Sequence, residues 1–340
     1  MKLDINIATD SLADVPALAR DAEALGFDGL WTAETRHDPF LPLALAAEHT
    51  RRVSLGTAIA VAFPRSPTVV AQAAWDLQAA SEGRFILGLG TQVKGHNERR
   101  FSVSWTAPGP RLRDYVLALR AIWECWQTGA PINFRSEHYS ITLMTPFFAP
   151  GPIAHPRIPI YVAAVNPYNL RLAGELCEGV HVHPFHSVRY LREFALPQIE
   201  AGLRKAGRSR RDITLGTSVF MVTGRTAAEQ ARARELARGQ IAFYASTRTY
   251  EPVLATHGWQ DLMPRLHRKS VEGDWTGMAA LVSDEMLETF TVEAPLDGLA
   301  AALAARYAGL LDRLAPYLPL ESRSDRGAIG AFATALRGRV

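Results

Sequence analysis

The sequence predicts an α/β fold, a single (β/α)8 TIM barrel with insertions, which forms one domain over residues 1–340. Eight segments with the apolar, β-branched character of strands alternate with helical segments along most of the chain. Most of these strands are near-continuous apolar runs, which is typical of parallel strands covered on both faces. Eight strand–helix units are the number that closes a (β/α)8 barrel.

The expected strands are short and rich in Val, Ile and Leu. In chain order they are LDINIAT (3–9), DGLWTA (28–33), VSLGTAIAVA (53–62), RFILGLG (84–90), IYVAAV (160–165), VHVHPF (180–185), ITLGTSVFMVT (213–223) and LLDRLAPYLP (310–319). The third strand is unusual because Gly56 interrupts its apolar run. Glycine inside a strand marks a bulge, or a place where another group approaches the backbone closely.

The expected helices follow these strands and carry apolar residues at helical spacing. They cover residues 14–27, 40–50, 66–83, 111–127, 167–179, 187–207, 227–246, 296–307 and 327–338. The helix after the third strand has the clearest ends, with Ser66 as N-cap, Pro67 at its first position and Gly83 beyond its last turn.

Three excursions interrupt the alternation, near 93–109, 130–158 and 245–290. The segment 131–143 is expected to form a hairpin, and the last excursion a mixture of helical and irregular structure. Excursions of this length are usually lids or binding loops. The rival architecture is a doubly wound open sheet, but the turn after the first strand, ATDSLAD, lacks the G-x-G-x-x-G pattern of that fold.

Composition and charge indicate which classes of partner to expect. The net charge is +3, and the densest basic run, at 204–212, has no interleaved aromatic residues for base stacking, so we expect no nucleic-acid partner. Neither a signal peptide nor a run of eighteen apolar residues is present, so no membrane association is expected. Cys125 and Cys177 lie in apolar helical patterns, which fits two buried thiols in a reducing cytoplasm. We expect a cytoplasmic homodimer that acts on a small-molecule substrate.

In a TIM barrel, chemistry takes place at the C-terminal ends of the strands. The candidates at these positions are Glu34, Thr35, Arg36, His37, Asp38, Thr57, Ala58, Ile59, Phe63, Gly88, Gly90, Thr91, Gln92, Lys94, Ala163, Ala164, Val165, Asn166, His181, His183 and His186. The three histidines raise the question of a zinc site, but no other cluster reinforces it, and we expect no metal. The sequence has no G-x-S-x-G, P-loop or H-E-x-x-H motif, so serine hydrolysis, nucleotide hydrolysis and zincin chemistry lack their residues.

Three stretches resemble the luciferase-like monooxygenase superfamily, and above all its coenzyme F420-dependent oxidoreductases. They are GFDGLWTAE (26–34), the block VSLGTAIAVAFPRSPTVVAQAAWDLQAASEGRFILGLGTQ (53–92) and IPIYVAAVNPYNLRLAGELCEGV (158–180). The resemblance covers most of residues 1–225, and the block 53–92 is its most specific part. It implies a barrel that holds a flavin or deazaflavin ring.

The resemblance also implies where the cofactor lies. The third strand would carry a bulge with a non-prolyl cis peptide at Ala58–Ile59, against which the ring rests. The other implied cofactor residues are Glu34 near the ring, Thr91 and Gln92 after the fourth strand, and Ala163, Ala164, Val165 and Asn166, whose backbone N–H groups would hold the phosphate at a helix start. A polyanionic F420 tail would pass over Lys94, Arg99, Arg100, Arg111 and Arg113.

The catalytic residues depart from the family's pattern. Family members often carry Asp-His at the end of the second strand, whereas this chain has Glu34-Thr35. A threonine does not act as a base at neutral pH, so we expect His37 or His183 to transfer the proton, with Glu34 beside the ring. Histidine suits that role because its ordinary pKa lies near 6.5.

Three functions follow from this interpretation. The first is an F420-dependent oxidoreductase that transfers hydride between the deazaflavin and a small organic substrate. The second is an FMN-dependent monooxygenase that uses oxygen and a separate reductase. The third is a flavin- or deazaflavin-binding protein without turnover.

Overall fold

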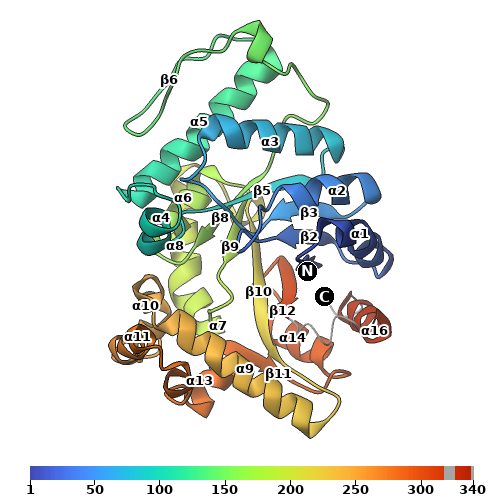
Figure 1. Ribbon diagram of the computed structural model, residues 1–340, viewed down its shortest axis with the longest axis vertical. Helices are drawn as coiled ribbons and strands as arrows, with labels where there is room; N and C mark the ends of the chain where they lie inside the picture. Colours follow the sequence, from blue (N-terminus) through green and yellow to red (C-terminus); the bar gives the residue numbers. More distant parts are fainter. Residues whose placement is uncertain (318–325, 338–340) are drawn as a thin grey trace.

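The computed structural model, which describes residues 1–317 and 326–337, contains a closed barrel of eight parallel strands surrounded by helices (Figure 1). The barrel strands are β1 (Lys2–Asn6), β2 (Gly29–Thr32), β3 (Ser54–Thr57) continued by β4 (Ala60–Val61), β5 (Phe85–Gly90), β8 (Ile160–Ala164), β9 (Gly179–Val182), β10 (Thr214–Val222) and β12 (Arg313–Tyr317). The barrel closes because β12 pairs in parallel with both β1 and β10. The predicted fold class is therefore confirmed.

The third predicted strand is split in two by a bulge. Gly56 on β3 pairs with Ile86 on β5, and Ala60 on β4 pairs with Leu89. Four steps along the third strand (56 to 60) thus match three steps along β5 (86 to 89), which leaves one extra residue in the third strand. An extra residue of this kind defines a β-bulge, so the interruption that Gly56 signals in the sequence is real.

Helices cover the outside of the barrel. They are α1 (Val15–Ala24), α2 (Leu41–His49), α3 (Pro67–Ala80), α5 (Pro108–Thr128), α6 (Pro167–Leu176), α7 (Val188–Tyr190) running through a π-helical turn (Leu191–Ala195) into α8 (Leu196–Lys205), α9 (Ala227–Ala245), α14 (Leu299–Tyr307) and α16 (Arg326–Arg337). The α3 helix begins as predicted, because the Ser66 hydroxyl accepts a hydrogen bond from the Val69 N–H and Pro67 opens the first turn.

The excursions form their own small elements. The first holds α4 (Lys94–Arg99), and the second holds the antiparallel hairpin of β6 (Phe134–Arg135) and β7 (Ser140–Ile141), which projects beyond α5 in Figure 1. The third holds α10 (Glu251–Ala255), α11 (Leu262–Glu272), α12 (Trp275–Ala279) and α13 (Asp284–Phe290). Sequence analysis missed the short strand β11 (Thr291–Glu293), which pairs with the end of β10. Residues 318–319 of the predicted eighth strand and Gly338 of the last helix lie outside the described residues.

The barrel lumen has a core of its own, separate from the large core between sheet and helices. Trp31, Ile86 and Tyr161 form this inner cluster, and Ala58 packs against it. Glycines on neighbouring strands make room for the rings. A Cβ at Gly56 would stand 2.2 Å from the Trp31 ring, and a Cβ at Gly179 would stand 2.4 Å from the Tyr161 ring. Side chains therefore fill the lower lumen completely.

A buried ion pair lies beside these rings. The Arg313 guanidinium donates two hydrogen bonds to the Asp4 carboxylate, at 2.8 and 2.7 Å, and both side chains are 3% exposed. Burial alone lowers the pKa of Arg313, but the Asp4 carboxylate outweighs this and holds that pKa above its ordinary value. The guanidinium also lies over the Trp31 ring, 5.3 Å from its centroid. The pair links the first and last strands at the point where the barrel closes.

The prediction of two buried thiols is confirmed. Both cysteines are buried and unpaired, and burial raises the pKa of the Cys177 thiol to about 12, which keeps it protonated and inert. In the basic run, Arg208 donates to the carbonyls of Gly174 and Cys177 at the end of α6, and Arg210 pairs with Asp312. No helix in the described part of the chain is long and apolar enough to cross a membrane.

The ion pair makes a testable prediction. We expect Asp4→Ala to lower the free energy of unfolding by about 3–5 kcal/mol, because it leaves the Arg313 charge buried and unpaired. The double variant Asp4→Leu/Arg313→Met should recover most of this loss, since no charge then stays in the lumen. Urea denaturation followed by circular dichroism measures both. A single variant as stable as the parent would show that the lumen tolerates an unpaired guanidinium.

Candidate active site

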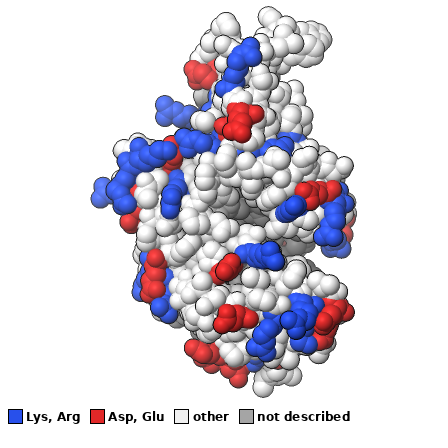
Figure 2. All heavy atoms as spheres, turned by 90° about the vertical axis from the view of Figure 1, so that its left-hand side faces the viewer, with Lys and Arg blue, Asp and Glu red and all other residues white. Residues whose placement is uncertain are grey.

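The C-terminal ends of the barrel strands open into a mouth walled by small side chains. Ala58, Ile59 and Ala163 are partly exposed there, and Gly90 lies between them. A Cβ at Gly90 would stand 2.7 Å from Ile59 and 3.4 Å from the Ala163 Cβ, so no larger residue fits at that position. The helices α4, α10 and α11 lie on this side, the left in Figure 1. Figure 2 looks onto the same side and shows a hollow with few charges at its centre and charged side chains of both signs around it.

The bulge forms part of this mouth. The Ala58–Ile59 peptide bond is cis, as the family resemblance implies. Backbone hydrogen bonds hold it from the second strand: the Ala58 N–H donates to the Thr32 carbonyl at 2.6 Å, and the Glu34 N–H donates to the Ile59 carbonyl at 3.1 Å. The bulge is thus fastened on both sides of the cis bond.

The Glu34 side chain completes this fastening. Its carboxylate accepts the Val61 N–H at 2.7 Å and the Arg65 guanidinium at 2.8 and 2.9 Å. Arg65 also donates to Asp38 at 2.9 Å. Burial lowers the pKa of Arg65, but the two carboxylates outweigh it and raise that pKa above its ordinary value. The Glu34 side chain is 7% exposed, and both of its carboxylate oxygens accept hydrogen bonds. Glu34 therefore stabilises the bulge.

Arg65 was not predicted as a site residue, although its position in the sequence indicates an ion pair with Glu34 and Asp38. Arg65 follows the third strand directly, and Glu34 and Asp38 follow the second. Because β2 and β3 pair in parallel, their C-terminal ends lie side by side, and opposite charges at those ends are expected to meet. The position of Arg65 is fixed further by Tyr115, whose hydroxyl donates to the Arg65 carbonyl at 3.0 Å.

The N-terminus of α6 forms a second part of the mouth. Asn166 is the N-cap in an extended conformation, but its side chain makes no capping bond and instead donates to the Thr249 carbonyl at 3.3 Å. Tyr190 donates to the Val165 carbonyl at 2.6 Å and holds the preceding loop. The Asn166 side chain therefore leaves the first-turn amides of α6 uncapped, and such amides suit an anion. Ala164 is buried on the strand below.

Thr91 and Gln92 lie at the end of β5 and are partly exposed. Asn97 donates to the Thr91 carbonyl at 2.9 Å and so fixes the turn. Gln92 has a φ of +56°, and its side chain accepts the Val93 N–H at 2.9 Å. The Gln92 side-chain oxygen is thus occupied locally, while Thr91 borders the mouth.

The predicted cationic residues differ in their availability. Arg113 forms a two-bond pair with Glu175, and Arg111 donates to the Tyr139 hydroxyl and lies over the Phe63 ring at 4.4 Å. Lys94 and Arg99 are exposed, and Lys94 has only a loose contact with Glu98 at 3.9 Å. Arg100 donates to the Thr35 carbonyl. Only part of the predicted cluster is therefore free for an anionic ligand.

The two predicted proton-transfer histidines have opposite surroundings. The His37 side chain is 58% exposed, with Nε2 3.5 Å from an Asp10 carboxylate oxygen. His183 projects beyond β9, and its Nδ1 accepts the Phe185 N–H at 3.1 Å. Burial, with a smaller effect of His186, lowers the pKa of His183 to about 3. His183 is therefore neutral near pH 7 and carries its proton on Nε2.

The other two histidines serve the framework. His181 lies in the lumen between Trp31 and Tyr161, with ring centroids 4.8 and 5.3 Å away. His186 is buried and bonds the His183 carbonyl and the Tyr307 hydroxyl. Within the described ranges, no group of three His, Cys, Asp or Glu side chains is placed to hold a metal ion.

Two tyrosines at the mouth were not predicted. Tyr244 at the end of α9 and Tyr250 before α10 contact the His183 ring, with centroids 4.5 and 4.4 Å away. Both come from the stretch that opens the third excursion. Nothing in the local sequence pattern separates them from ordinary helix residues, so only the fold reveals them.

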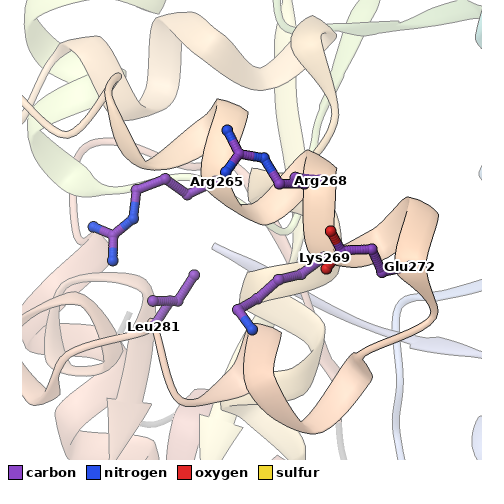
Figure 3. Close-up of a pocket in the computed structure, with 5 residues that line it drawn as sticks. All are labelled: Arg265, Arg268, Lys269, Glu272 and Leu281. Atoms are coloured by element: carbon purple, nitrogen blue, oxygen red, sulfur yellow. The ribbon is translucent and has the colours of Figure 1, made fainter.

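A recess of about 310 Å³ lies beside α11 (Figure 3). Its lining residues are Arg265, Arg268, Lys269, Glu272 and Leu281. Lys269 is already paired with Asp274 at 2.5 Å, and the two arginines are exposed. Long exposed cations of this kind do not define a preorganised site, so the barrel mouth is the candidate active site.

Comparison with known proteins agrees with this geometry. The sequence model of the luciferase-like monooxygenase family matches residues 3–313. An uncharacterised protein of Mycobacterium tuberculosis is 48% identical over 316 residues, 93% of each chain. The 5,10-methylenetetrahydromethanopterin reductase of Archaeoglobus fulgidus is 30% identical over 283 residues, 81% of this chain and 80% of the relative. The structure of coenzyme F420-dependent tetrahydromethanopterin reductase from Methanopyrus kandleri superposes with a TM-score of 0.79 at 20% identity, covering 99% and 98% of the two chains.

The Glu34 contacts predict a stability effect. Glu34→Ala should lower the free energy of unfolding by about 2–4 kcal/mol, because the Val61 N–H loses its partner and the Arg65 guanidinium keeps only Asp38 of its two carboxylates. The matched control is Glu98→Ala, which removes a carboxylate from an exposed contact and should change stability by less than about 0.5 kcal/mol. Thermal and urea unfolding measure both variants. Equal effects would mean that Glu34 does not support the bulge.

Proposed function

The chain belongs to the luciferase-like monooxygenase family, and on that premise we propose that it is a coenzyme F420-dependent oxidoreductase. When bound, the deazaflavin supplies or accepts the hydride that is exchanged with a small organic substrate. The relatives that match most of this chain include an archaeal methylenetetrahydromethanopterin reductase and a mycobacterial protein named as a putative coenzyme F420-dependent oxidoreductase.

The observation that carries the proposal is the wall of the mouth around the bulge. Ala58 and Ala163 are partly exposed and present only methyl groups, and Gly90, which is buried between Ile59 and Ala163, adds no side chain. A planar tricyclic ring needs such a surface, because it must lie against the barrel without displacing side chains. The residues present thus fit the group that the family implies.

The α6 N-terminus fits the phosphate of that group. The N–H groups of its first turn are not capped by Asn166, and the helix dipole favours an anion there. Ala163, Ala164, Val165 and Asn166 would place the phosphate, Thr91 and Gln92 would border the ring and its side chain, and Ile59 would line the ring with Ala58.

Four side chains of the protein have the remaining roles in positioning and proton transfer. Glu34 and Arg65 hold the bulge in place and so position the ring. His37, which is exposed at the edge of the mouth, is the residue we assign to proton transfer, because an imidazole exchanges protons near neutral pH. His183 is neutral and contributes a hydrogen bond from Nε2 rather than acting as a base.

An FMN-dependent monooxygenase is the alternative, since the same wall suits either tricyclic ring. The engagement of Arg111 and Arg113 leaves fewer cations for an F420 tail than the sequence suggests, with Lys94, Arg99 and Arg100 nearest to that role. A binding protein without turnover is the third candidate, which any measured turnover removes. A cytoplasmic location and a homodimer complete the proposal.

Cofactor titration tests the proposal directly. We expect the purified apo-protein to bind F420 more tightly than FMN, with F420 affinity falling as salt rises to about 0.1 M, because exposed ion pairs are then screened. Ala58→Trp should abolish both interactions, since the indole would fill the place of the ring. Fluorescence titration at two salt concentrations measures each affinity. Tighter binding of FMN than of F420 would favour the monooxygenase.

The assignment of His37 has a separate test. In the F420-loaded protein, His37→Ala should lower kcat by about 10²–10⁴-fold and leave F420 affinity unchanged, because only proton transfer is lost. His155→Ala, at an exposed histidine beside Gly83, is the control and should keep full activity. If His37→Ala were as active as the parent, proton transfer would have to use another group.

A further inference from the structure

Two tyrosine side chains contact the His183 ring at the mouth, and two phenylalanine rings flank them. The Tyr244 and Tyr250 rings lie 4.5 and 4.4 Å from the imidazole, and 5.7 Å from each other. Phe220 on β10 stacks on Tyr244 at 6.1 Å, and Phe185 meets Tyr250 edge-on at 6.0 Å. The three polar rings thus form one cluster, built by β9, α9 and the loop that precedes α10.

Each of the three rings carries a polar hydrogen for which the described residues offer no hydrogen-bond partner. His183 accepts the Phe185 N–H at Nδ1, so its Nε2 holds the proton. In the part of the chain that the structure describes, neither the Tyr244 nor the Tyr250 hydroxyl forms a hydrogen bond. The His183, Tyr244 and Tyr250 side chains are partly exposed.

The surroundings of the cluster are uncharged. Burial lowers the pKa of His183 to about 3, raises the pKa of Tyr244 to about 12 and raises the pKa of Tyr250 further. The groups that add to these effects are His186, Tyr317 and Tyr244 itself, and no carboxylate or cation among the described residues contributes. All three groups stay protonated hydrogen-bond donors across the physiological range.

We propose that His183 Nε2 and the hydroxyls of Tyr244 and Tyr250 form a three-donor subsite for the carbonyl oxygen of a neutral substrate with an apolar or aromatic body. The rings that carry these donors lie 4.4 to 5.7 Å from one another between centroids, and the flanking rings of Phe185 and Phe220 suit an apolar group. A carbonyl oxygen accepts hydrogen bonds and carries no charge to desolvate. A phosphate dianion would find no cation within the cluster and would lose its hydration without compensation.

This inference rests on the proposed function, because it names the substrate class of the same mouth. Polarising a carbonyl with neutral donors favours hydride addition at its carbon from the reduced deazaflavin. With the deazaflavin bound as the reductant, the electron pair of the π bond would move to the oxygen, which the three donors hold and which would take its proton from His37 through solvent. The carbonyl compound would be reduced to an alcohol.

Binding of a ketone probe tests the subsite without turnover. The probe is 2-acetylnaphthalene labelled with ¹³C at its carbonyl, compared with 2-ethylnaphthalene and 2-naphthyl phosphate. We expect the ketone to bind about 10-fold more tightly than either, since only the ketone offers an uncharged acceptor. Its carbonyl stretch should fall on binding, because hydrogen bonds weaken the C=O bond. Isotope-edited infrared spectroscopy measures the stretch and calorimetry the affinity.

Variants then assign the donors. His183→Phe, Tyr244→Phe and Tyr250→Phe should each weaken ketone binding by about 2- to 12-fold and raise the stretch, whereas binding of 2-ethylnaphthalene should stay unchanged. Tyr139→Phe is the control, because that hydroxyl serves Arg111 beside the projecting hairpin. Absence of saturable ketone binding, tighter binding of the phosphate, or an unshifted stretch in all three variants would overturn the subsite.

The cofactor is measured separately in the same proteins. We expect F420 affinity to stay at the parent value in all three variants, since the donors face the substrate. Loss of F420 binding by the parent protein, with the ketone pattern intact, would contradict the proposed function and leave the subsite standing. Loss of the ketone pattern, with F420 binding intact, would overturn the subsite and leave the proposed function standing.

Discussion

The contact between the Glu34 carboxylate and the third strand supports the rest of the mouth. A bulge leaves backbone groups without ladder partners, and those groups need other partners to stay in one conformation. Glu34 supplies them from the neighbouring strand, through its own N–H to Ile59 and its carboxylate to Val61. Arg65 then balances the buried charge and ties it to Asp38. One side chain thus joins two strands, the bulge and the helix that follows.

The barrel lumen beneath the bulge is filled by side chains, in contrast to the mouth above it. Trp31 and Tyr161 fill it with large rings, and Gly56 and Gly179 yield the space that these rings need. Above this layer the inward positions change to Ala58, Gly90 and Ala163. The same barrel is therefore packed at its lower end, where packing stabilises it, and open at its upper end, where a ligand has to enter.

Two parts of the fold form the mouth, and their physical roles differ. The barrel strands and the α6 N-terminus supply rigid backbone and small side chains, which suit a cofactor that must be held in one orientation. Tyr244 on α9 and Tyr250, near the start of the third excursion, contact the neutral His183 ring. The rigid scaffold and the start of an insertion thus meet at the mouth.

The sequence by itself determined the architecture, because strand and helix periodicity is local and is repeated eight times. It also indicated the bulge, since Gly56 breaks an apolar run, and the α3 cap, since Ser66 and Pro67 act within one turn. The tertiary structure alone decided what the polar groups do. Arg65 meets Glu34 only after β2 and β3 pair, and His183 loses its basicity only because the fold buries it near His186. A side chain's charge state depends on burial and on partners distant in sequence, and no local pattern records either.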